Sequence, residues 1–294
     1  MQRHNNEERV DKMSEIMPVY IVIDASQSML WSGEFDDSQD STSIKKIDII
    51  KNVIPSLTDY METKTVLRKG VKISLVLFNQ ETKERISQMD YYGLKKEWTK
   101  VESEIKNRVF RIEDNDYKVE GRTYFGELFK SLKIMIDRDI KRNIEQGNDV
   151  YRPLVYFFTD GFPQGEEMEY VESMFNDLTS KSRVEDKTAP VIFGVGVGKC
   201  VDLDTLSKFG AGRVLARHKN VGEYKAGDKR FVFAVKSGVD VKDALEKLHD
   251  KIWTSILWSF TKAKVELKNS VKEVVNQEDD DDYLEKWLIR AGRK

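Results

Sequence analysis

The sequence predicts an α/β fold in which a doubly wound, mostly parallel sheet is covered by helices on both faces. Two observations support this prediction. Short, nearly continuous apolar segments rich in β-branched and aromatic residues recur along the chain, as expected for parallel strands buried on both faces. Segments with apolar residues at helical spacing lie between them, and strands that alternate with helices form mostly parallel sheets.

The expected strands come at regular intervals along the first two thirds of the chain. The segments with the pattern of a buried strand are Val19–Ile23, Val71–Phe78, Pro153–Phe158 and Val191–Val197. A further segment, Glu81–Met89, alternates between polar and apolar residues and follows the turn residues Asn79 and Gln80. This pattern predicts an antiparallel hairpin partner at one edge of the sheet.

Helices are expected between and after these strands, because apolar residues recur there every three or four positions. The segments with this spacing are Ile47–Met61, Leu94–Ile105, Phe125–Ile136, Met168–Leu178 and Val241–Ile256. Together with the strands, they place one α/β domain at residues 18–260.

Polar or charged segments flank this domain. Residues 1–17 are expected to form a polar N-terminal arm, and residues 261–294 a charged C-terminal extension with an unbroken acidic run, Glu278–Asp282. After the run, apolar residues at helical spacing predict a short amphipathic helix: Tyr283, Leu284, Trp287 and Leu288. The segment Arg217–Arg230 is locally basic, and its acidic and glycine residues favour a surface loop.

Composition excludes several classes of function. The formal net charge of −2 gives no general electrostatic basis for binding nucleic acid. The start of the chain lacks the apolar core of a signal peptide, and the longest apolar runs are of strand length, which is too short for a membrane span. Cys200 is the only cysteine, so no internal disulfide can form. These features favour a cytoplasmic protein.

Polar side chains follow two of the expected strands at the point where each strand ends. Asp24, Ser26 and Ser28 alternate in V-Y-I-V-I-D-A-S-Q-S-M-L, so in an extended segment their side chains point the same way. Asp160 likewise follows the apolar run of P-L-V-Y-F-F-T-D-G, and Thr123 lies between a glycine-containing loop and a helical pattern. In open α/β sheets, ligands bind at the carboxyl ends of the strands.

These side chains indicate a site for a hard divalent cation. All of them offer oxygen, and none offers sulfur or imidazole nitrogen. Such a donor set favours Mg²⁺, Mn²⁺ or Ca²⁺ over zinc or copper. Among these three ions we expect Mg²⁺ or Mn²⁺ before Ca²⁺.

The same residues resemble a known motif. The pattern D-x-S-x-S, a threonine at a loop–helix junction and D-G after a buried strand resemble the von Willebrand factor A (vWA) domain. Asp24, Ser26, Ser28, Thr123 and Asp160 match its metal-ion-dependent adhesion site (MIDAS) residue for residue. S-Q-S-M, T-x-x-G-E-L-F and F-F-T-D-G-x-P are also typical of the family. The resemblance implies a Rossmann-like sheet with one antiparallel edge strand.

The resemblance also implies how such a site works. The serines and the threonine coordinate the metal through their hydroxyls, and the aspartates often act through water. Because neutral hydroxyls leave much of the cation's charge unquenched, a Glu or Asp of a protein partner can displace one water and bind the ion. V-I-F-G-V-G-V-G-K-C-V-D-L-D-T-L-S-K-F-G is similar to cytosolic bacterial TerY-like members of tellurite-resistance and stress systems. That branch implies association with a kinase–phosphatase signalling module.

Other chemistries have less support in the sequence. The glycines of Gly194–Cys200 do not have P-loop spacing, and Cys200 stands where a Ser or Thr would hold Mg²⁺. A Mg²⁺-dependent phosphate-handling hydrolase is the alternative function, because paired carboxylates near Mg²⁺ can activate water. No nucleophile or general base adjoins the motif, since His4, His218 and His249 lie elsewhere in the sequence. We therefore predict a binding module and not an enzyme.

One departure from the family concerns the segment between Ser28 and Ile44, which is longer than the turn such domains often have there. We interpret residues 31–43 as a surface insertion. Its acidic residues Asp36, Asp37 and Asp40 leave open a second reading, in which the insertion covers or screens the metal.

Overall fold

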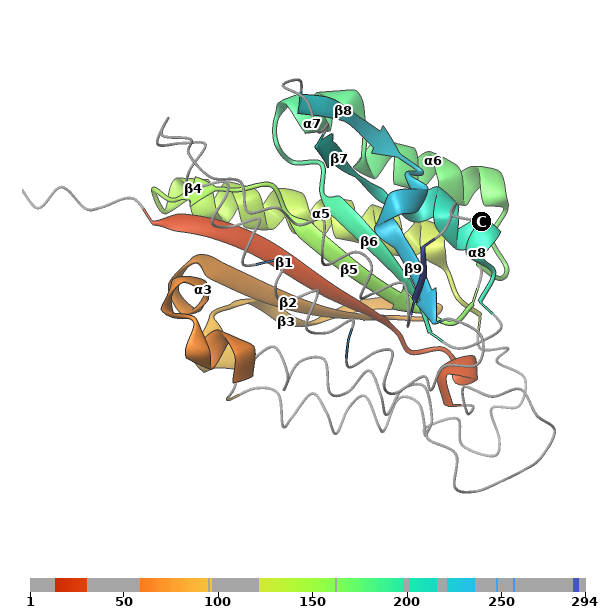
Figure 1. Cartoon of the computed structure of the whole chain (residues 1–294), viewed down its shortest axis with the longest axis horizontal. Coiled ribbons are helices and arrows are strands. Elements are labelled where there is room, and N and C mark those ends of the chain that lie inside the picture. Colours follow the sequence, from red (N-terminus) through yellow and green to blue (C-terminus); the bar gives the residue numbers. More distant parts are fainter. Residues whose placement is uncertain are drawn as a thin grey trace, which may run out of the picture.

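The computed structural model describes residues 14–30, 59–94, 96, 122–161, 163–197, 201–215, 221–235, 247, 256 and 288–290. Its centre is one twisted sheet with the strand order β10-β9-β6-β5-β1-β2-β3, and helices flank it on both faces (Figure 1). The α/β, Rossmann-like, mostly parallel fold that the sequence predicted is therefore confirmed.

The central strands run parallel and end at the same edge of the sheet. They are β1 (Glu15–Asp24), β2 (Val71–Phe78), β5 (Leu154–Thr159), β6 (Val191–Gly196) and β9 (Val232–Val235). Strand β1 lies between β2 and β5, with Ile23 opposite both Leu77 and Phe158. Strand β3 (Thr82–Met89) pairs antiparallel with β2, which confirms the predicted edge hairpin.

The sequence did not predict β9, and the sheet contains further strands that it did not predict. Strand β4 (Asp149–Val150) pairs with the start of β1, and β7 (Ala211–Leu215) forms an antiparallel hairpin with β8 (Val221–Ala226). Strand β8 lies inside the segment interpreted as a surface loop, and that interpretation was wrong for these residues. Strand β10 (Leu288–Arg290) pairs antiparallel with β9, so Leu288 belongs to a strand and not to the predicted helix.

Two long helices cover one face of the sheet. They are α5 (Phe125–Glu145) and α6 (Met168–Leu178), which confirm two of the predicted helices and lie behind β5 and β6 in Figure 1. Shorter helices complete the described part: α3 (Thr65–Gly70), α7 (Lys181–Glu185), α8 (Leu203–Leu206), η1 (Gln27–Leu30), η2 (Ser207–Phe209) and η3 (Lys229–Phe231). Residues 59–63 and 91–94 are also helical, at the end and at the start of predicted helices.

The central strands have a continuous apolar sequence because each face of the sheet packs against its own core. On β1, Tyr20 and Val22 point toward α5 and α6, whereas Val19, Ile21 and Ile23 pack on the opposite face with Leu67 of α3 and with Met61. The α5 side is dominated by aromatic rings in edge-to-face or tilted contact: Phe125, Phe129, Phe157, Phe175 and Phe209. Alternate residues of one strand thus fill two cores.

A buried polar network joins α5 to the sheet. The Tyr20 hydroxyl donates a 2.8 Å hydrogen bond to Oδ2 of Asp139, and both side chains are fully buried. Arg138 donates to Oδ1 of Asp139 at 2.8 Å and reaches Glu84 of β3 at the same distance. The network therefore fixes the helix against both β1 and β3.

Several predictions fall on residues outside those that the structure describes. These are residues 1–13 of the predicted arm, the 31–43 insertion, most of the helices expected over Ile47–Met61, Leu94–Ile105 and Val241–Ile256, and the acidic run Glu278–Asp282. The predicted domain boundaries stay predictions, although β1 begins within the predicted arm and β10 lies in the predicted extension. No helix in the described ranges is both long and apolar enough to cross a bilayer.

Candidate metal site

The candidate site lies where β1 and β5 end side by side. Asp24 is the last residue of β1, and Asp160 directly follows β5. Because the two strands are parallel neighbours with Ile23 opposite Phe158, their following residues emerge at the same edge of the sheet. The Asp24 side chain is fully buried, and Asp160 is 8% exposed.

The two serines bridge these carboxylates. After β1 the chain turns at once into η1, and the Ser26 amide donates a 2.8 Å hydrogen bond to Oδ1 of Asp24. The hydroxyls of Ser26 and Ser28 lie 3.1 Å apart, and the Ser28 hydroxyl donates to Oδ1 of Asp160 at 2.8 Å. The predicted residues Asp24, Ser26, Ser28 and Asp160 therefore come together, but through the turn into η1 and not through alternation along an extended strand, because β1 ends at Asp24.

A fifth side chain, Thr159, joins the group and was missed by the sequence reasoning. Its hydroxyl donates a 2.7 Å hydrogen bond to Oδ2 of Asp24 and accepts one from the Gly161 amide at 3.2 Å. Ser28, which follows β1 in η1, thus contacts Asp160, which follows β5, and Thr159 of β5 contacts Asp24 of β1. The available signal was a hydroxyl residue at the last position of a buried strand, directly before an aspartate.

Backbone hydrogen bonds connect Thr123 and its neighbour Tyr124 to the segments that follow two of the strands. Its side chain is 3% exposed, and its carbonyl accepts a 3.0 Å hydrogen bond from the amide of Gln164, in the segment after Asp160. The next amide, that of Tyr124, donates at 3.0 Å to the carbonyl of Asn79, which follows β2. Strands β2 and β5 are the two neighbours of β1, and the structure therefore holds Thr123 between the ends of these two strands.

The electrostatics of the pair favour a cation. Burial, and then the neighbouring carboxylate of Asp160, raise the pKa of Asp24 from 3.8 to about 7, although hydrogen bonds from Thr159 and Ser26 act in the opposite direction. Two carboxylates so close together repel one another when both are ionised. A divalent cation would remove that repulsion, so the charge of the site fits the predicted metal.

The spacing of the oxygens also fits a small hard cation. Neighbouring ligands of an octahedral Mg²⁺ at 2.0–2.1 Å lie about 2.9 Å apart. The observed separations of 3.1 Å between the serine hydroxyls and 2.8 Å between Ser28 and Asp160 are close to this edge length. Within the described ranges, no group of three or more Cys, His, Asp or Glu side chains is arranged to hold a metal ion, so this donor set depends on hydroxyls.

Comparisons with known proteins support the fold. No protein-family model matches the sequence, and no curated protein matches it either. The pilus adhesin SpaC from Lactobacillus rhamnosus GG matches with a TM-score of 0.51 and 9% identity, covering 85% of this chain and 31% of the adhesin. At such low identity this likeness shows the fold alone.

Two further solved structures match less closely. The manganese-loaded TRAP protein of Plasmodium vivax has a TM-score of 0.43 and 15% identity over 80% of this chain and 72% of its own. Proximal thread matrix protein 1 from the mussel byssus, with a zinc-occupied MIDAS motif, has a TM-score of 0.44 and 16% identity over 82% of this chain and 45% of its own. The chain therefore spans less than half the length of the adhesin and of the byssus protein.

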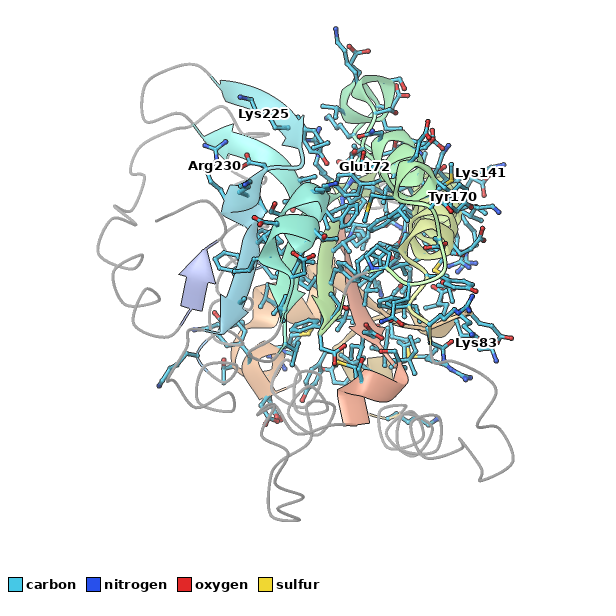
Figure 2. All side chains as sticks on the ribbon, turned by 90° about the vertical axis from the view of Figure 1, so that its right-hand side faces the viewer. Lys83, Lys141, Tyr170, Glu172, Lys225 and Arg230 are labelled. Carbon is cyan, nitrogen blue, oxygen red and sulfur yellow. The ribbon has the colours of Figure 1, made fainter. Side chains whose placement is uncertain are left out.

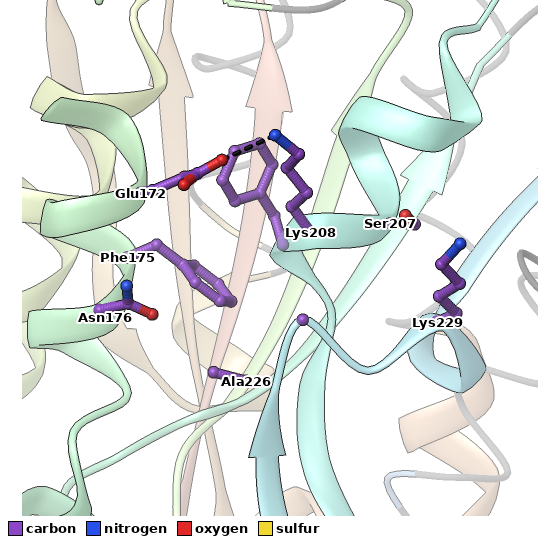
Figure 3. Close-up of a pocket in the computed structure, with 9 residues that line it drawn as sticks. Glu172, Phe175, Asn176, Ser207, Lys208, Ala226 and Lys229 are labelled. Carbon is purple, nitrogen blue, oxygen red and sulfur yellow. Dashed lines mark hydrogen bonds and ion pairs between the residues drawn. The ribbon is translucent and has the colours of Figure 1, made fainter. Parts of the chain in front are cut away.

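A separate pocket of about 300 Å³ lies away from these residues. It opens between α6, η2 and the turn after β8, with Phe175 and Phe209 among its lining residues. Glu172 and Lys208 form a 2.7 Å ion pair across it (Figure 3). None of the predicted metal ligands lines this pocket, so it is not part of the candidate site.

Proposed function

We propose that this chain is a metal-dependent protein-interaction module of the vWA type. In this proposal Asp24, Ser26, Ser28, Thr123 and Asp160 hold one divalent cation, Mg²⁺ or Mn²⁺. The observation that carries the proposal is the crossed pair of hydrogen bonds, Ser28 to Asp160 and Thr159 to Asp24, which together with the contact between Ser26 and Ser28 gathers two carboxylates and two serine hydroxyls at one partly buried point.

In this proposal the hydroxyl and carboxylate ligands have different roles. The bound cation would supply a strongly electrophilic centre for an anionic ligand. The hydroxyls of Ser26, Ser28 and Thr123 would bind the cation without neutralising it, and the carboxylates of Asp24 and Asp160 would balance part of its charge. Since each oxygen of Asp24 already accepts a hydrogen bond, from Ser26 or from Thr159, this carboxylate is suited to orienting the ligands around it.

The partner in this proposal is a protein that offers a Glu or Asp side chain. A hard cation whose charge is only partly neutralised by its protein ligands prefers a carboxylate as a further ligand. We extend the proposal to a cytoplasmic bacterial stress-response or defence signalling system with a kinase or phosphatase partner. The support for this extension is the similarity of residues 191–210 to TerY-like proteins, together with the composition of the chain.

The first test separates binding from catalysis. Protein saturated with Mg²⁺ or Mn²⁺ should hydrolyse neither nucleoside triphosphates nor a generic phosphoester above background. Turnover that disappears in Asp160→Ala would instead favour the alternative, a Mg²⁺-dependent phosphate-handling hydrolase. The three histidines, His4, His218 and His249, lie outside the described residues, so this assay decides the question directly.

The second test identifies the partner by its chemistry. Proteins captured from a lysate by the wild type in Mn²⁺ should be lost both with chelator and with Thr123→Ala. Each acidic residue of a captured protein is then replaced by its amide, and one such replacement should abolish binding in calorimetry. Unchanged affinity in the presence of chelator would show that the interface does not involve the metal.

A further inference from the structure

Helix α5 begins directly after Thr123 and takes its N-terminal cap from another part of the chain. The residue before the helix, Tyr124, makes no capping hydrogen bond with its side chain. Instead, the Glu166 carboxylate accepts hydrogen bonds from the amides of Gly126 at 2.8 Å and Glu127 at 3.1 Å. The first amides of a helix need such acceptors, and a negative charge there also interacts favourably with the helix dipole.

Two further contacts join the same segments. The amide of Gln164 donates to the carbonyl of Thr123 at 3.0 Å, and the Tyr170 hydroxyl donates to Oε1 of Glu127 at 2.5 Å. Tyr170 lies on the side of the molecule that carries α5 and α6 (Figure 2). Residues 164–170 therefore contact the start of α5 at several points.

The glycine at the start of α5 makes this close approach possible. A Cβ atom at Gly126 would lie 2.5 Å from Cε1 of Tyr170 and 3.0 Å from Oε1 of Glu166, which is too close for either side chain to keep its position. The T-x-x-G spacing therefore has a local physical reason, because only glycine lets the 164–170 segment lie against the first turn of α5.

This arrangement links two segments of the candidate metal site that are distant in sequence. Glu166 follows Asp160 in the segment after β5. Its carboxylate caps α5, and Thr123 lies just before that helix. We propose that Glu166 is a positioning residue that fixes the Thr123 hydroxyl relative to Asp160 and so preorganises the metal site. This inference rests on the proposed function and adds a residue that makes no contact with the metal.

The test compares Mn²⁺ affinity, measured by electron paramagnetic resonance of free Mn²⁺, in the wild type and three variants of the full chain. Glu166→Ala removes both amide acceptors, and Glu166→Gln keeps one oxygen. Glu172→Ala is the matched control, because this glutamate also lies on the α6 side but pairs with Lys208 at 2.7 Å, away from the site. We expect about tenfold weaker binding for Glu166→Ala, a smaller loss for Glu166→Gln and no change for the control.

A second measurement separates positioning from simple stabilisation. The melting temperature is recorded for each variant with chelator and with saturating Mn²⁺, and affinities are compared at a temperature where all variants are folded. Glu166→Ala should show faster hydrogen exchange at the Gly126 and Glu127 amides and a smaller metal-induced rise in melting temperature.

The outcomes distinguish this inference from the proposed function. If the wild type binds no Mn²⁺, the proposed function fails, and this inference fails with it. If the wild type binds Mn²⁺ and Glu166→Ala binds it equally well, the proposed function stands and the positioning role is overturned. A lower melting temperature with an unchanged metal increment would also overturn it, because Glu166 would then only stabilise the helix.

Discussion

The Thr159 hydroxyl donates a 2.7 Å hydrogen bond to Oδ2 of Asp24, which belongs to the neighbouring strand. Both side chains are fully buried. The bond exists because β1 and β5 pair in a register that places Ile23 opposite Phe158, so the residue after each lies at the same height. Thr159 of β5 therefore fixes the orientation of the Asp24 carboxylate. The same strand leads directly into Asp160, the second carboxylate of the candidate site.

Thr159→Val should weaken Mn²⁺ binding by about tenfold, because an unsupported Asp24 carboxylate is less well oriented. The same change should lower the free energy of unfolding by about 1–3 kcal/mol, since a buried acceptor loses its donor. Calorimetric titration and urea unfolding measure the two effects. Thr179→Val is the matched control: this buried threonine donates to the carbonyl of Phe175, so its loss should affect stability alone.

The raised pKa of Asp24 predicts opposite effects of pH on stability and on metal binding. In metal-free protein the folded state holds this proton more tightly than the unfolded state does, with a pKa of about 7 against 3.8. The stabilisation is therefore complete below about pH 4 and is lost as the pH rises through about 7. Affinity for Mn²⁺ should instead increase over the upper part of this range, because the cation competes with the proton.

The variant Asp24→Asn tests the predicted direction of the pH dependence of stability. With chelator present, the variant should lose less stability than the wild type between pH 5 and pH 8 in urea unfolding. At pH 8 it should be the more stable protein, because the repulsion between Asp24 and Asp160 is gone. An identical pH dependence in the two proteins would show that Asp24 does not titrate in this range.

Thr123→Ala should reduce Mn²⁺ affinity at least as strongly as Thr159→Val, because the proposal makes the Thr123 hydroxyl a direct ligand. Thr123→Ser keeps the hydroxyl and should retain most of the affinity. Both variants keep the backbone bond from Gln164, so the fold should change little. Equal affinity in the alanine and serine variants would remove Thr123 from the ligand set.

Tyr20→Phe tests a part of the fold that lies outside the site. It removes the buried hydrogen bond to Asp139 and leaves that carboxylate with Arg138 as its charged partner. The free energy of unfolding should fall by about 1–3 kcal/mol, while Mn²⁺ affinity stays unchanged. A large loss of affinity would mean that the position of α5 matters to the site more than the local contacts indicate.

The sequence predicted four of the central strands, β1, β2, β5 and β6, because their burial on both faces leaves a continuous apolar signal, whereas the short central strand β9 was missed. Strand β2 has the predicted bounds, Val71–Phe78, at both ends. Strands β8 and β10 were missed for physical reasons. Strand β8 reads V-G-E-Y-K-A, which lacks a continuous apolar pattern, and β10 is three residues long and depends on a distant partner, β9.

In the candidate site, too, features that are local in the sequence could be predicted, whereas features that depend on distant parts of the chain could not. Asp24, Ser26 and Ser28 could be predicted because the end of the apolar strand and the polar residues that follow it are local features of the sequence, although η1 and not an extended strand places Ser28. Thr159 and Glu166 could not be predicted, since their roles depend on the register between β1 and β5 and on the path of the chain after Asp160. The metal-binding role of the predicted ligands stays a prediction.

The most direct test of this account is calorimetric titration of Mn²⁺ and Mg²⁺ into the wild type and Asp24→Asn at pH 8, where the Asp24 carboxylate is ionised. Near-ultraviolet circular dichroism establishes that both proteins are folded. We predict that the wild type binds one divalent cation and that Asp24→Asn binds none. Absence of binding to the wild type, or equal binding by both proteins, would contradict the assignment of this site.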